Sequence, residues 1–220
     1  MKNDADMVGA NLFYSHEGKD ALAEYKYSSM NLGVQNKRNV GEYSYYCGLF
    51  CSRIYRREFI TKNDIFFLEG VSYEDSFFNF MTALYANKVV KYEGAFYHYV
   101  YNPVSTTKKR NDIKQYDKLS VIDTTFEECK KRGLYDVYSN EIDFKYIYML
   151  EGAIRPIVKN FDHPETDKFK EIRKMIKKNV SDYRTNPYYN LLSTKKKATL
   201  ELVMKVPSLV PLIGKVIFSK

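Results

Sequence analysis

Apolar residues recur at two different periods along the first half of the chain. Spacings of three and four predict a helix from Gly41 to Ile60 and another from Phe77 to Tyr85. Short apolar or aromatic runs between polar residues predict strands, and Glu93-Gly94 is the predicted turn between the last two. Residues 21–30 are predicted as either a strand or an irregular excursion. The remaining predicted strands are residues 5–14, 65–67, 89–92 and 95–101.

The pattern becomes helical after residue 108. An apolar stripe over residues 119–129 predicts one helix, and Gly133 follows it as a stop signal. Further helices are predicted at residues 142–158, which bend or end near Pro156, at residues 169–180, and at residues 191–206.

These patterns predict an α/β fold of the α+β-like kind with two parts. Residues 1–108 would combine short strands with flanking helices. Residues 109–220 would form a mainly helical extension with an amphipathic tail. A chain of 220 residues with 45% hydrophobic residues can bury a core, which excludes disorder of the whole chain.

The cysteines do not indicate a disulfide framework. Their number is odd, and they are Cys47, Cys51 and Cys129. This usage favours a reducing cytoplasm. Cys47 and Cys51 lie four positions apart with no further His or Cys pair nearby to complete a zinc site, so we interpret both as small apolar residues on a helix.

The net charge of +8 favours anionic partners such as lipid headgroups or nucleotide phosphates. Nucleic acid is not expected, because the basic residues are spread along the chain and no recognisable binding module is present. No signal peptide is expected, and no run of about 18 apolar residues predicts a membrane span. We therefore expect a cytoplasmic protein, with peripheral attachment to the inner face of the membrane as an option.

One stretch carries a resemblance to a known family. Val71-Ser72-Tyr73-Glu74-Asp75-Ser76-Phe77-Phe78-Asn79-Phe80 follows a basic and an aromatic segment, and it precedes the tyrosine-rich segment Phe96-Tyr97-His98-Tyr99. This order resembles the carboxyl-terminal half of the catalytic domain of bacterial family 2 glycosyltransferases, which have a GT-A fold. The resemblance covers about residues 1–108 and implies a partial GT-A mixed sheet with flanking helices there. The nucleotide-sugar-binding half of such a domain is expected to be missing.

The acidic pair is the principal candidate for catalysis. In inverting members of the family, the Asp of such a pair is the general base that deprotonates the acceptor hydroxyl, which implies this role for Asp75 with Glu74 as its neighbour. Tyr73 is a further candidate for substrate contact. Alternatively, the acidic pair has a structural role. Ser72 followed by Asp75 resembles a capping box, and carboxylates in a first helical turn interact favourably with the helix dipole.

Three other residues are candidates for substrate contact. His98 could approach a metal or diphosphate, or it could be an ordinary histidine of the core or the sheet face. Ser105 lies in the polar turn after the tyrosine segment, although Val100 stands where the family often has an arginine. Arg53 could contact acceptor or phosphate, or it could belong, with Arg56 and Arg57, to a basic helix end that compensates the dipole.

The family's metal, Mg or Mn, is expected to be held mainly by the missing half. Asp4-Ala5-Asp6 looks like the metal-binding carboxylate motif of nucleotide-sugar transferases. Only three residues precede it, whereas the family's motif follows a nucleotide-binding fold of about a hundred residues. Asp4 and Asp6 therefore match the loop and strand start that come after that motif, and no metal site is predicted in this chain.

The tail permits two interpretations. Lysines punctuate an apolar segment from Leu200 to Phe218, and Pro207 and Pro211 prevent one continuous helix. Such a basic amphipathic tail can lie on an anionic membrane surface. It can equally fold onto the helical extension as ordinary core.

Two functions remain open from the sequence. The first is a truncated or split glycosyltransferase that moves a sugar from a nucleotide-sugar to a saccharide or lipid-linked acceptor in surface polysaccharide synthesis. It would be completed by a donor-binding half. The second is a non-catalytic remnant that acts as a binding or assembly module at the membrane. Half of a mixed sheet leaves open edges, so self-association or a partner chain is also predicted.

Overall fold

The computed structural model describes residues 4–24, 32–34, 50–103, 105 and 109–218. The chain divides into two compact units. The first unit consists of residues 1–69 and 74–103, and the second of residues 70–73 and 104–220. A mixed sheet with helices is thus followed by a mainly helical extension, which confirms the predicted fold class. That residues 1–108 are the acceptor-side half of a glycosyltransferase domain stays a prediction.

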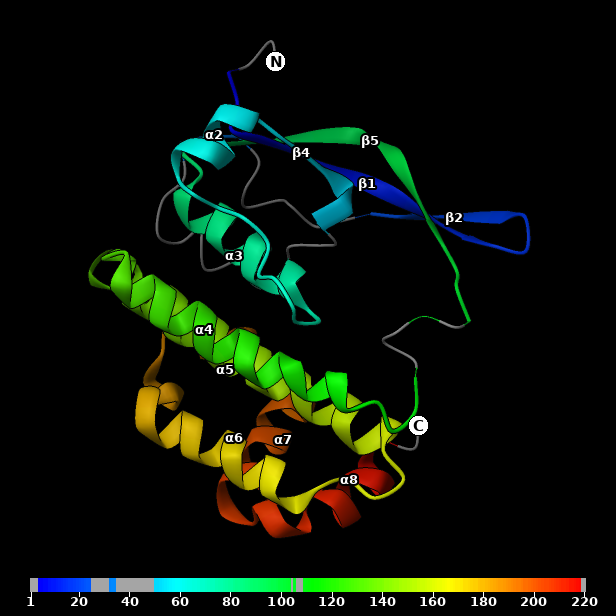
Figure 1. Ribbon diagram of the computed structural model, residues 1–220, viewed down its shortest axis with the longest axis vertical. Helices are drawn as coiled ribbons and strands as arrows, with labels where there is room; N and C mark the ends of the chain where they lie inside the picture. The colour runs from blue at the N-terminus through cyan, green and yellow to red at the C-terminus, as the bar shows by residue number, and fades with distance from the viewer. Residues whose placement is uncertain (1–3, 25–31, 35–49, 104, 106–108, 219–220) are drawn as a thin grey trace. The chain divides into compact units, whose positions relative to one another are not determined.

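The first unit is built on one mixed sheet with the order β2-β1-β5-β3 (Figure 1). Its long strands, β1 (Met7–His16) and β5 (Lys88–Val100), run parallel to each other. The shorter strands β2 (Lys19–Ala23), β3 (Leu32–Val34) and β4 (Arg53–Tyr55) pair antiparallel with them. β1 pairs with β4 near its start and with β2 near its end, so it is the organising strand of the unit.

Helix α3 (Glu74–Tyr85) covers one face of this sheet (Figure 1). Apolar side chains of the helix and of the strands are buried together, and the ring of Phe78 stacks on Phe67 at 4.3 Å and meets Tyr55 at 5.1 Å. The buried side chains of α3, β1 and β5 include Met7, Ala10, Leu12, Phe77, Phe80, Met81, Leu84 and Val89. The predicted helix at residues 77–85 is confirmed, and it starts three residues earlier, at Glu74.

Strand β5 replaces the two short strands that were predicted for residues 89–101, so that prediction was wrong. The pairing of β5 with β1 shifts register between Ala10 and Asn11 and again between Asn11 and Phe13. The buried side chain of Asn11 donates a hydrogen bond of 2.8 Å to the Glu93 carbonyl at this irregularity. A glycine within a strand pattern marks a bulge as readily as a turn, and Gly94 marks a bulge here.

Residues 50–67 also differ from the prediction. Residues 41–49 lie outside the described part of the chain, but the rest of the predicted helix is a 3-10 turn, η1 (Phe50–Ser52), followed by strand β4. Helix α2 (Arg57–Lys62) then begins. The predicted strand at residues 65–67 is a loop, in which the Ile65 N–H donates to the Ile60 carbonyl and closes α2. Pairing with β1, which local periodicity does not encode, decided the conformation of residues 53–55.

The second unit contains five α-helices among the described residues (Figure 1). They are α4 (Asp117–Lys131), α5 (Leu134–Asn160), α6 (Thr166–Asn179), α7 (Thr194–Lys205) and α8 (Val210–Ile217). The short 3-10 turns are η3 (Ile113–Tyr116), η4 (Tyr183–Thr185), η5 (Tyr189–Leu191) and η6 (Pro207–Leu209).

Helices α4 and α5 form a hairpin that turns at Gly133, whose φ of 69° suits glycine. Pro156 lies inside α5 and does not end it, because the helix continues to Asn160. The non-helical residue of α5 is Tyr138, so the irregularity was predicted at the wrong place. In the tail, Pro207 begins η6 and Pro211 is the second residue of α8, and the helix is interrupted as predicted.

No helix in the described ranges has both the length and the apolar character that crossing a membrane requires.

Candidate functional site

The predicted acidic pair opens helix α3. Glu74 and Asp75 occupy its first turn, and both side chains are half-buried. Tyr73 precedes the helix with a positive φ of 69°, so Tyr73 and not Ser72 stands at the cap position. The Ser72 N–H instead donates 3.0 Å to the Asp117 carboxylate, which belongs to the same unit as Ser72. The capping-box interpretation of Ser72 and Asp75 was therefore wrong in its register.

Asp75 belongs to a cluster of polar side chains in the first unit. The Cys51 thiol of η1 is hydrogen-bonded to the Tyr97 hydroxyl of β5. Burial raises the pKa of this thiol, and the negative charge of Asp75 raises it further. The Tyr97 hydrogen bond and the charge of Arg53 act in the opposite direction. Residues from η1, β4, β5 and the first turn of α3 thus influence one another electrostatically.

Tyr97 is the member of this cluster whose side chain reaches the solvent. The pKa of its hydroxyl is raised, first by the charge of Cys51 and then by burial. Its side chain is still 38% exposed. A tyrosine ring of this kind offers an apolar surface with a polar edge, which suits the mixed surface of a sugar.

Arg53 is buried in β4, with 6% exposure, and its guanidinium donates 2.6 Å to the side-chain oxygen of Asn79. Asn79 lies one turn after Asp75 on α3, so both side chains lie on the same face of that helix. The prediction of a basic helix end was wrong, because Arg53 is in a strand. Arg56 precedes the first residue of α2 and pairs with Asp4 at 2.6 Å.

His98 lies on the sheet face. Its ring stacks on Phe13 at 4.9 Å, and its Nδ1 is 3.1 Å from Ser15 Oγ and 3.3 Å from an Asp20 oxygen. Successive side chains of a strand point to opposite faces, so His98 faces away from the side on which Tyr97 meets Cys51. The structure therefore separates His98 from the Asp75 cluster.

The two remaining predicted residues, Tyr73 and Ser105, belong to the second unit. Lys118 Nζ lies 4.6 Å from the centre of the Tyr73 ring, which is a cation–π contact. Ser105 is half-buried. Of the six predicted residues, Arg53, Glu74 and Asp75 are those that the elements of the first unit bring to the start of α3.

The sequence interpretation missed Cys51, Asn79 and Tyr97 as members of the site. Asn79 was detectable as a polar residue within the apolar run of α3, where a buried amide needs a partner. Cys51 was interpreted as a small apolar residue, although its thiol is hydrogen-bonded and half-buried. Nothing local to the sequence relates Cys51 to Tyr97, because sheet formation alone brings them together.

Asp4 and Asp6 have structural contacts. The Asp6 carboxylate accepts from the backbone N–H groups of Asn87 and Lys88 at 2.7 and 3.0 Å and so ties the start of β1 to that of β5. Within the ranges that the structure describes, no group of three or more His, Cys, Asp or Glu side chains is arranged to hold a metal ion.

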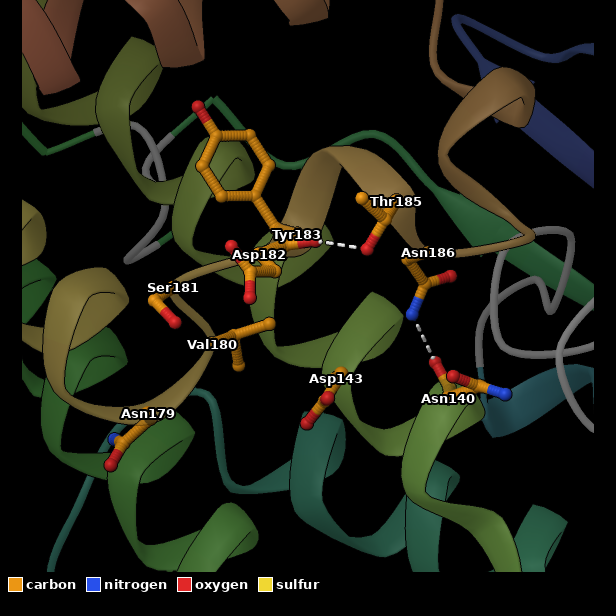
Figure 2. Close-up of a pocket in the computed structure, with 9 residues that line it drawn as sticks. All are labelled: Asn140, Asp143, Asn179, Val180, Ser181, Asp182, Tyr183, Thr185 and Asn186. Carbon is orange, nitrogen blue, oxygen red and sulfur yellow. Dashed lines mark hydrogen bonds between the residues drawn. The ribbon is translucent and has the colours of Figure 1, made fainter.

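A polar cavity of about 240 Å³ lies in the second unit (Figure 2). Asn186 closes one side by donating 2.7 Å to the Asn140 carbonyl, and burial raises the pKa of Asp143. None of the predicted site residues lines this cavity. Its lining residues are Asn140, Asp143, Asn179, Val180, Ser181, Asp182, Tyr183, Thr185 and Asn186.

No protein-family model matches the chain, and neither does any curated protein. One similar solved structure is residues 1–349 of TarS from S. aureus, with 12% sequence identity and a TM-score of 0.34. The match covers 98% of this chain and 52% of the TarS chain. The chain thus spans about half the length of the structure it matches, and similarity at this level does not identify its family.

Proposed function

We propose that this chain is the acceptor-side part of a glycosyltransferase with Asp75 as general base. It would transfer a sugar from a nucleotide-sugar to a saccharide or lipid-linked acceptor in surface polysaccharide synthesis. The observation that carries the proposal is the position of Asp75. Asp75 is half-buried in the first turn of α3. Its negative charge raises the pKa of the Cys51 thiol, which is hydrogen-bonded to the exposed Tyr97.

The chemistry assigned to Asp75 is a single proton transfer coupled to substitution. The acceptor hydroxyl donates a hydrogen bond to the carboxylate and gives up its proton as its oxygen attacks the anomeric carbon. The bond from that carbon to the diphosphate oxygen breaks, and the nucleoside diphosphate leaves with the electron pair. The start of a helix stabilises the negative charge that a carboxylate base needs before the proton arrives.

The neighbours of Asp75 have supporting roles in this proposal. Tyr97 offers a ring and hydroxyl on which an acceptor sugar can rest. The Arg53–Asn79 hydrogen bond fixes α3 on β4, and so fixes the height of its first turn above the sheet. Glu74, in the same turn, would bind a second acceptor hydroxyl.

The donor side is proposed to come from outside this chain. A nucleotide-binding partner chain or a further segment of a longer protein would hold the nucleotide-sugar and the Mg²⁺ or Mn²⁺ that the resembled family uses. The lipid-linked form of the acceptor favours a cytoplasmic location on the inner face of the membrane. Self-association also stays a prediction.

Sugar transfer in cells tests the proposal with all natural partners present. Cells that carry Asp75→Asn in place of the natural protein should lose labelling of the surface polysaccharide by a factor of about 10² to 10⁴, the usual contribution of a general base. The asparagine keeps the size of the side chain and removes the proton acceptor. The measurement is incorporation of radiolabelled sugar at equal protein levels.

Glu69→Gln is the matched control, because Glu69 is an exposed carboxylate of the first unit just before the α3 segment. Its labelling should equal that of the natural protein. Full labelling in the Asp75→Asn cells would remove Asp75 as the base.

A second candidate function is the non-catalytic binding or assembly module at a membrane. The exposed apolar face of the tail helix α8 favours it. For such a module, Asp75→Asn would leave labelling unchanged, while loss of the tail contacts would reduce it.

A further inference from the structure

The tail helix α8 has one face packed on the second unit. Val210, Gly214 and Phe218 follow one another at helical spacing and are buried. A Cβ added at Gly214 would come within 3.1 Å of the Val158 side chain of α5. This close approach shows that α8 is seated directly on α5, so its buried face is already occupied.

The opposite face of the tail is apolar and exposed. Leu209, Leu212 and Val216 are spaced by three and four residues, which places them on one side of the helical segment. Leu212 is 71% and Val216 76% exposed. Exposed apolar side chains that gather on one side of a helix mark an interaction surface.

Two basic cavities flank α8, and Phe218 lines both of them. Their volumes are about 400 and 210 Å³. The first contains the cations Arg155, Lys195 and Lys196, and the second contains Arg110, Lys159 and Lys215.

Among the residues that the structure describes, carboxylates pair with two of these six cations. Lys196 pairs with Glu151 at 2.5 Å, and Arg110 pairs with Asp162. Lys215 donates 2.6 Å to a backbone carbonyl, that of Asp162, which carries no net charge. Arg155 and Lys159 are exposed and stand one turn apart on α5. The surroundings of α8 therefore combine an apolar ridge with an excess of positive charge.

We propose that this end of the second unit docks on an anionic lipid bilayer. The Leu209–Leu212–Val216 face inserts at the boundary between headgroups and acyl chains, and the cations of the two cavities contact lipid phosphates. An anionic bilayer meets both features at once. A second copy of the chain would cover the apolar face but would bring two sets of six cations together, which opposes pairing. The inference rests on the second unit alone and does not require sugar transfer.

Vesicle flotation with the full chain tests this docking. The chain should float with vesicles of phosphatidylcholine containing about a third phosphatidylglycerol, should stay in solution with pure phosphatidylcholine, and should be released by salt. Leu212→Glu should reduce the bound fraction at least tenfold. Leu22→Glu is the matched control, because Leu22 is a 52% exposed leucine on β2 of the first unit. It should bind as the natural chain does.

A second experiment tests the cations. The double variant Arg155→Gln with Lys159→Gln should weaken vesicle binding several-fold, whereas Lys19→Gln on β2, the control, should leave binding unchanged. The chain has no tryptophan, so Leu212→Trp gives a unique reporter whose emission should shift to the blue only with anionic vesicles. Absence of binding to anionic vesicles, or equal binding of Leu212→Glu, would overturn the proposal. A dimer that Leu212→Glu converts to monomer without any vesicle binding would assign the face to a second copy.

Discussion

The Cys51 thiol is a chemical probe of the residues around Asp75. Its thiol is half-buried, bonded to Tyr97, and subject to opposing charges from Arg53 and Asp75. Tyr97 and Asp75 are both distant from Cys51 in the sequence. The thiol therefore reports whether Asp75 stands beside β5, as the proposed base must.

Alkylation of Cys51 measures this environment. The reaction of the thiolate with iodoacetamide should rise with pH around a midpoint above that of an ordinary thiol, near 8.5, because burial disfavours the charged form. Asp75→Asn removes a nearby negative charge, so the midpoint should fall. Fragment-ion mass spectrometry separates Cys51 from Cys47 on the same peptide and from Cys129, whose pKa burial raises to about 12.

Glu69→Gln serves again as the comparison and should leave the midpoint where it is. A midpoint that does not move in Asp75→Asn would mean that the carboxylate points away from Cys51. In that case the position assigned to the base would be wrong.

At the residue scale, the sequence predicted that the acidic pair opens a helix, because carboxylates at a helix start leave a local signal. It did not predict that Arg53 is buried. An arginine that two others closely follow is typical of a solvated surface, and the distant amide of Asn79 supplies a partner for its buried guanidinium. Cys51 and Tyr97 were missed because they, too, are brought together from distant parts of the sequence.

At the scale of elements, the Arg53–Asn79 hydrogen bond joins β4 to α3. Both residues are buried, with 6% and 8% exposure. Asn79→Ala removes the acceptor of a buried charged donor, which should lower the free energy of unfolding by about 1.5–3 kcal/mol. Urea unfolding followed by tyrosine fluorescence measures the change.

Asn87→Ala is the control at this scale, since Asn87 is exposed just after α3. It should change the free energy of unfolding by less than about 0.5 kcal/mol. An equally small effect of Asn79→Ala would show that the Arg53 contact does not hold α3 on the sheet.

The sequence predicted elements correctly where an apolar stripe continues over several helical turns. It failed where pairing between distant strands determines the conformation. Helices α3, α4 and α6 carry sustained apolar stripes, and the sequence located them. Strand β4 has three residues and no period of its own, so a helical pattern was extended over it. In β5, Gly94 was interpreted as a turn, because the Asn11 side chain that bonds the bulge lies far away in the sequence.

At the scale of the whole molecule, the chain contains two units with different tasks in this account. The first holds the Asp75 cluster on a mixed sheet, and the second exposes the apolar face of α8 between basic cavities. The change from mixed to helical patterning predicts a boundary near residue 108. The parallel pairing of β1 with β5 was not predictable, because it joins residues far apart in the sequence.

The central claim is that Asp75 receives the proton of an acceptor hydroxyl, and a structure with acceptor bound tests it most directly. Crystals of the protein soaked with oligosaccharide fragments of the surface polysaccharide should show one sugar hydroxyl about 2.6–3.2 Å from the Asp75 carboxylate. The same sugar should rest on the Tyr97 ring. A saccharide bound in the first unit whose hydroxyls all lie beyond reach of Asp75 would contradict the account.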